Sequence, residues 1–209
     1  MPRNAHEYSQ FSPAKQNITK YFTVSLVVLL PCISFLNQKW HLPIQALGQS
    51  VAFYLSAAFI VIFVLPTNKP PCQFGVANCV TLLRLIIVAI FTSTIGFLHL
   101  IPDIGMWWLM ALGVSGIALD GVDGWLARSL GLESEFGAKF DMEVDAAFIL
   151  ILSLIAYELP HIGPWVILAG LLRYIFLAGG CAFPALRRTC LLYTSDAADE
   201  RSSVDLGGR

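Results

Sequence analysis

The chain is organised by six apolar stretches separated by short polar segments. They lie at roughly 21–36, 45–66, 80–102, 104–119, 144–157 and 163–183. A helix that spans a bilayer needs about 20 mostly apolar residues, because each residue rises about 1.5 Å across a core of about 30 Å. The second, third and sixth stretches reach that length by themselves. The pattern therefore predicts an all-α, polytopic membrane helical bundle with about six transmembrane helices.

The other three stretches are shorter. The first contains Pro31, which favours a kinked or only partly inserted helix. The fourth is long enough only if its helix continues past Asp120, and the fifth only if its helix begins before Val144. Such continuations would place ionisable groups on membrane helices.

Composition agrees with a bilayer as the solvent. The chain of 209 residues is 56% apolar and 13% charged, whereas soluble domains are about 45–50% apolar and about 25% charged. A formal net charge of -1 and the lack of a basic tract give no reason to expect a nucleic-acid partner.

Basic residues predict the orientation in the membrane. If the six stretches alternate, one side holds all of the following residues: Arg3, Lys15, Lys20, Lys69, Arg84, Arg128, Lys139, Arg187 and Arg188. The loops on the other side hold Lys39. The positive-inside rule then places both termini and the 120–141 segment at the cytoplasmic face, and we expect a bacterial inner membrane.

Acidic residues cluster just where the apolar pattern weakens. The cluster comprises Asp120, Asp123, Glu133, Glu135, Asp141, Glu143 and Asp145. An aspartate at the centre of a membrane helix costs about 2.5–3.5 kcal/mol on insertion scales, so a concentration of carboxylates needs a functional reason.

The spacing of four aspartates supplies such a reason. Asp120 and Asp123 share one helical face, as do Asp141 and Asp145. A turn near Gly131 would make the two helices antiparallel neighbours and bring the pairs together. Four converging carboxylates repel one another, which protonation or a cation must relieve. Oxygen ligands suit Mg²⁺ or Mn²⁺, and so many carboxylates fit two ions about 3.5–4 Å apart.

Small residues accompany the aspartates. Gly124 and Ala127 lie on or near the face of the first pair, and Gly137 precedes Asp141 by one turn, so that a flat nucleotide can approach the helix backbones. Arg128 is well placed to meet phosphate charge. The alternative is that these small residues are ordinary helix-packing positions, which are common in membranes.

The combined pattern resembles the signature of the CDP-alcohol phosphatidyltransferase family. All eight specified positions match: Asp120-x-x-Asp123-Gly124-x-x-Ala127-Arg128, eight residues, then Gly137-x-x-x-Asp141-x-x-x-Asp145. A looser match, Asn78-x-x-Thr81-x-x-Arg84, resembles the start of the first core helix of that family, although an interfacial helix cap is an alternative reading.

The resemblance implies an enzyme of phospholipid biosynthesis. Family members displace CMP from a CDP-alcohol donor, often CDP-diacylglycerol, by attack of an acceptor alcohol at a membrane, and they usually form homodimers. The roles that it implies are metal ligation for Asp120, Asp123 and Asp141, a position near the metal and the general-base role for Asp145, and substrate binding for Gly124, Ala127, Arg128, Gly137, Asn78 and Thr81.

The resemblance covers roughly residues 74–188 and sets the expected domains. Residues 1–70 would be an added two-helix membrane extension, and residues 71–188 would hold four of the six family core helices. The polar segment 189–209 resembles translated sequencing-adapter read-through or a disordered tail. We therefore expect a C-terminally truncated product of a parent that dimerises.

Two other functions fit parts of the pattern. Membrane prenyltransferases also hold magnesium and diphosphate with aspartate-rich motifs, but they separate the two motifs widely along the chain. A cation transporter or channel would place its acids nearer mid-membrane and would not need the Gly-x-x-Ala-Arg spacing.

Overall fold

The computed structural model describes residues 11–64, 76–130 and 135–182, and it describes side chains for 17–63, 78–122 and 136–176. The chain divides into two compact units, Met1–Gly170 and Leu171–Arg209. The predicted tail, 189–209, and the predicted turn at Gly131 lie outside the described residues.

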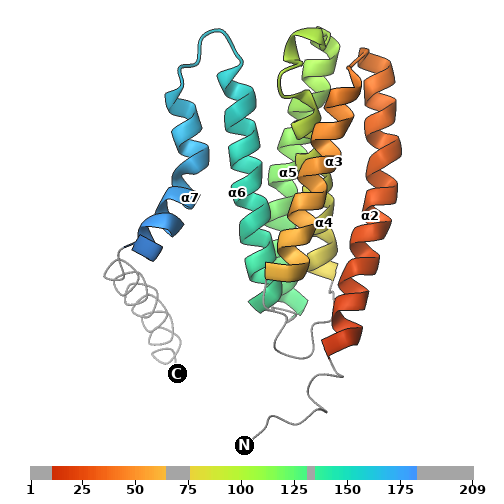
Figure 1. The fold of residues 1–209 in the computed structure, drawn as a ribbon, viewed down its shortest axis with the longest axis vertical. Helices are drawn as coiled ribbons and strands as arrows, with labels where there is room; N and C mark the ends of the chain where they lie inside the picture. The colour runs from red at the N-terminus through yellow and green to blue at the C-terminus, as the bar shows by residue number, and fades with distance from the viewer. Residues whose placement is uncertain (1–10, 65–75, 131–134, 183–209) are drawn as a thin grey trace, which may run out of the picture. The chain divides into compact units, whose positions relative to one another are not determined.

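Apart from short connecting turns, the described part of the chain is helical (Figure 1). Its elements are α2 (Phe11–Trp40), α3 (Ile44–Phe59), the π-helical η1 (Ile60–Val64), α4 (Val76–Thr94), the 3-10 segment η2 (Leu98–Leu100), α5 (Asp103–Leu130), α6 (Glu135–Tyr157) and α7 (Trp165–Ala182). This arrangement confirms the predicted all-α class.

Helix α4 is the centre of the first unit, because α2, α3, α5 and α6 all pack against it. Its residues from Leu85 to Thr94 are buried without interruption. A helix that is surrounded on every side has no solvent-facing or lipid-facing stripe, so its sequence is apolar all round. The same surroundings explain why the few polar residues of α4 must find partners inside the bundle.

The helix boundaries test the predicted stretches. Helix α5 continues through Asp120 to Leu130, and α6 begins at Glu135, so both predicted continuations are confirmed. A single helix over 80–102 is wrong: α4 ends at Thr94, and Gly96 follows with a φ of 81°, a conformation that favours glycine. The Gly96 N–H donates to Glu158 Oε1 at 2.6 Å, which ties this turn to the end of α6.

Pro31 does not end the first helix, because α2 runs through it from Phe11 to Trp40. Among the described residues, three segments are long and apolar enough to cross a membrane, namely Asn17–Trp40, Ile44–Phe63 and Asp103–Val122. Two shorter apolar helical segments are Asn78–Thr94 and Trp165–Phe176.

Large apolar side chains also cover the outside of these helices. Exposed examples are Val24, Val27, Phe35, Phe59, Phe63, Ile104, Trp107 and Trp108. Soluble monomers rarely expose apolar surface on this scale. The protein is therefore an integral membrane protein whose outer surface faces lipid.

The two N-terminal helices pack closely onto the rest of the unit. Ser50 of α3 donates its hydroxyl to the Ala89 carbonyl of α4 at 2.5 Å. The Tyr54 hydroxyl of α3 bonds the Phe22 carbonyl of α2 at 2.9 Å. The Phe22 ring in turn lies 5.8 Å, centroid to centroid, from Phe140 of α6. Helices α2 and α3 thus support the helices that carry the candidate site.

Candidate acidic site

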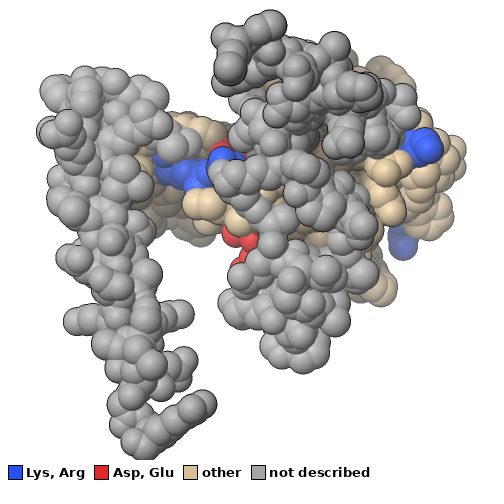
Figure 2. All heavy atoms as spheres, turned by 90° about the horizontal axis from the view of Figure 1, so that it is seen from below, with Lys and Arg blue, Asp and Glu red and all other residues tan. Residues whose placement is uncertain are grey.

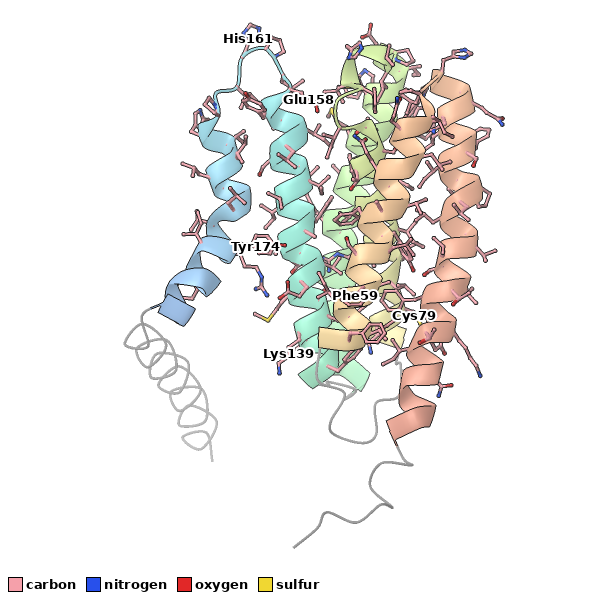
Figure 3. All side chains as sticks on the ribbon, in the orientation of Figure 1. Phe59, Cys79, Lys139, Glu158, His161 and Tyr174 are labelled. Carbon is pink, nitrogen blue, oxygen red and sulfur yellow. The ribbon has the colours of Figure 1, made fainter. Side chains whose placement is uncertain are left out.

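The candidate site lies where α4, α5 and α6 meet, toward one end of the bundle. Figure 3 shows Cys79 of α4 and Lys139 of α6 at that end, while Glu158 and His161 lie at the opposite end. Viewed from that end, acidic side chains are visible (Figure 2). Each of the three helices contributes charged side chains to one cluster.

Arg84 of α4 is the centre of this cluster, and its side chain is only 2% exposed. Its Nη1 atom lies 3.0 Å from Asp120 Oδ1 and donates to Asp141 Oδ1 at 2.7 Å. Its Nη2 atom pairs with Asp145 Oδ1. One guanidinium therefore joins a carboxylate of α5 to two carboxylates of α6.

The three aspartates lie close enough to hold a metal ion. One carboxylate oxygen from each of Asp120, Asp141 and Asp145 lies within 4.8 Å of the other two. Their side chains are 32% to 47% exposed, so water and a polar ligand can reach them. Three negative charges against one positive charge leave a formal charge of −2, which an oxygen-seeking divalent cation would neutralise.

The structure changes the predicted picture of how the site forms. Helices α5 and α6 run antiparallel, as expected (Figure 1). Both pack mainly against α4 rather than against each other, so α4 is the element that brings the two aspartate pairs into one place.

The remaining predicted site residues divide into two groups. Asn78 and Thr81 of α4 are buried, 6% and 2% exposed, on the stretch that leads to Arg84, and Gly137 lies one turn before Asp141 on α6. Four others lie on the last turns of α5, but their side chains are outside the described residues: Asp123, Gly124, Ala127 and Arg128.

Sequence reasoning missed the part that Arg84 plays. It used Arg84 as a marker of orientation and as the last position of a loose motif. The available signal was its setting, because an ionisable residue inside an otherwise apolar helix usually points to a partner within the bundle. Seven acidic residues lie between positions 120 and 145, so that partner was also to be expected there.

The site is an acidic cluster inside a membrane helical bundle, and comparison with known proteins agrees with this description. The sequence model of the CDP-alcohol phosphatidyltransferases matches residues 74–193, more than half of the chain. The chain belongs to the CDP-alcohol phosphatidyltransferase family. The match begins after α2 and α3. It contains the four residues of the ion-pair network, Arg84, Asp120, Asp141 and Asp145.

A curated relative is the CDP-diacylglycerol–glycerol-3-phosphate 3-phosphatidyltransferase of Cereibacter sphaeroides. The two are 30% identical over 125 residues, which cover 58% of this chain and 56% of the relative. The chain thus spans little more than half the length of that relative. No solved structure matches the chain.

Proposed function

We propose that this protein, or the longer protein to which the sequence belongs, transfers a phosphatidyl-type group from a CDP-alcohol to an acceptor alcohol and releases CMP. CDP-diacylglycerol is the proposed donor, since the relative bears that donor in its name. The observation that carries the proposal is the convergence of Asp120, Asp141 and Asp145, three positions of the family signature, on one point.

The carboxylate oxygens of the site fit a divalent metal such as Mg²⁺ or Mn²⁺. Asp120, Asp123 and Asp141 are the proposed ligands, with Asp145 beside them, and two ions are proposed. Bound metal would neutralise the diphosphate of the donor and stabilise the charge that develops on departing CMP.

Residues of the chain would take up the proton of the acceptor and bind the substrates. In the proposed reaction the acceptor oxygen attacks the phosphorus next to the donor alcohol, the bond from that phosphorus to the CMP oxygen breaks, and Asp145 takes the proton of the acceptor hydroxyl. Gly124, Ala127 and Gly137 would line the cytidine pocket, Arg128 would meet phosphate, and Asn78 and Thr81 would complete the substrate site.

The setting of the site agrees with a lipid substrate. The outer surface of the bundle is apolar, while the aspartates lie toward one end and are partly exposed. A lipid tail can therefore stay in hydrocarbon while the nucleotide stays in water. We propose that this end faces the cytoplasm of a bacterial inner membrane, because the basic residues lie on that side, and that the full-length parent is a homodimer.

The first prediction tests the chemistry in membranes that contain the protein. CMP release from CDP-diacylglycerol should require Mg²⁺ or Mn²⁺ and one alcohol from a panel that includes glycerol 3-phosphate. Asp145→Asn should lower turnover at least about a hundredfold, the scale of a lost general base, while nucleotide binding persists.

Glu143→Gln is the matched control, because Glu143 lies two positions away on α6 and so nearly on its opposite side. It should keep turnover near that of the unmodified protein. Undiminished turnover in Asp145→Asn would remove Asp145 from the base role. Release of pyrophosphate from an added prenyl diphosphate, with no release of CMP from CDP-diacylglycerol, would favour a prenyltransferase.

A further inference from the structure

Arg84 is an unusual residue for the interior of a membrane bundle, because a buried guanidinium is costly unless it is fully paired. The three carboxylates that pair with it in the described part of the chain lie on other helices. They come from positions 120, 141 and 145, and they are three of the carboxylates to which the proposed function assigns the metal and the base.

The guanidinium bridges the three carboxylates: Nη1 contacts both Asp120 and Asp141, and Nη2 contacts Asp145. The planar fork of an arginine suits such multiple contacts, whereas a lysine offers one compact charge. The guanidinium therefore holds the carboxylates of α5 and α6 near one another.

We infer that Arg84 is a positioning residue that acts as the built-in counter-cation of the acidic site. It keeps the three aspartates assembled before metal arrives, and its positive charge opposes the binding of a divalent cation among them. The inference rests on the proposed metal site. It predicts that removing the charge of Arg84 strengthens metal binding and weakens turnover, two changes of opposite direction.

The test measures Mn²⁺ binding to the purified protein in detergent by electron paramagnetic resonance, together with CMP release. Arg84→Gln should bind Mn²⁺ about tenfold more tightly, the effect expected for a single charge about 5 Å from a divalent ion even at the dielectric constant of water. Its CMP release should nevertheless fall, because the carboxylates have lost their common anchor.

Two further variants separate charge from shape. Arg84→Lys keeps the positive charge, so its Mn²⁺ affinity should stay near that of the unmodified protein while turnover is only partly restored. Lys39→Gln makes the same change of charge in the last turn of α2, at the end of the bundle away from the site, and should alter neither property (Figure 1).

Stability provides a readout that needs no activity. Arg84→Gln leaves three like charges together, so its thermal unfolding temperature should fall markedly in EDTA and recover with saturating Mn²⁺. The unmodified protein should show a smaller difference between these two conditions.

The outcomes are distinct. Weaker or unchanged Mn²⁺ affinity in Arg84→Gln, or a rise in affinity in Arg84→Lys as large as in Arg84→Gln, would overturn the counter-cation role. If neither the unmodified protein nor any variant binds Mn²⁺, the proposed metal site itself fails, and the inference fails with it. Binding by Arg84→Gln alone would support the inference in its strongest form.

Discussion

The two halves of α4 bury polar side chains in opposite ways. In the first half of the helix, Arg84 reaches carboxylates on α5 and α6. Near its end, Thr92, Ser93 and Thr94 are equally buried, but each hydroxyl donates to a carbonyl three or four residues earlier on the same helix.

The comparison separates buried polar side chains that only need a place in the helix from those that need charged partners on other helices. A hydroxyl that bonds its own helix satisfies itself wherever that helix lies, so it needs no particular neighbour. A guanidinium cannot do this, and it is stable in the bundle only because other helices supply charge. The first half of α4 therefore depends on the chemistry of its neighbours, and the second half depends on their shape.

Close side-chain packing surrounds Phe148 of α6, which lies against the second half of α4. Its ring lies 6.0 Å from the Phe91 ring, centroid to centroid. The ring also lies against Gly116 of α5, where an added Cβ would be 3.0 Å from Phe148 Cζ. Small residues at such positions let membrane helices approach closely.

Phe148→Ala should have the largest effect on stability in this half. Loss of a buried ring costs about 3–5 kcal/mol in soluble cores, and we expect less here because lipid solvates the exposed surface. Unfolding in detergent, followed by circular dichroism, measures the loss. The Mn²⁺ affinity of the folded fraction should not change; a change comparable to that of Arg84→Gln would break the distinction between the two halves.

Gly116→Ala should have a smaller effect. Overpacking against the Phe148 ring costs about 1–3 kcal/mol, which the better helix propensity of alanine offsets by about 1 kcal/mol. Gly121→Ala is the control on the same helix, since nothing lies within 4 Å of its added Cβ. The unfolding temperature of Gly116→Ala should be the lower of the two, and the reverse order would argue against close packing at Phe148.

The smallest effects should come from hydroxyls. Ser50→Ala removes a hydrogen bond between α3 and α4 and should cost about 0.6 kcal/mol, the average for bonds between membrane helices. Ser93→Ala removes a bond within α4 and should cost less, because the Ile90 carbonyl keeps its place in the helix. Paired unfolding measurements compare the two, and equal losses would show that the distinction does not extend to hydroxyls.

Much of this protein follows from local pattern. The apolar stretches predicted the helices, and the need for length correctly extended α5 past Asp120 and started α6 before Val144. Helical spacing placed Asp141 and Asp145 on one face, and the structure shows both of them at Arg84. These results depend on the rise and turn of a helix, which are the same in every sequence.

Other features required the tertiary structure. The end of α4 at Thr94 depends on a turn at Gly96 that Glu158 holds from a distant part of the chain. The support of Phe140 by Phe22 joins helices more than a hundred positions apart in the sequence.

The amino-acid order by itself determined which residues form helices and which acids share a face. Only the packed bundle decided that both acidic helices pack against α4 and that Arg84 joins their carboxylates. The physical reason is that helical periodicity defines the faces of each helix but not the helix that each face meets. In a bilayer, side-chain packing and hydrogen bonding between helices make that choice, because lipid and neighbouring helix are equally apolar.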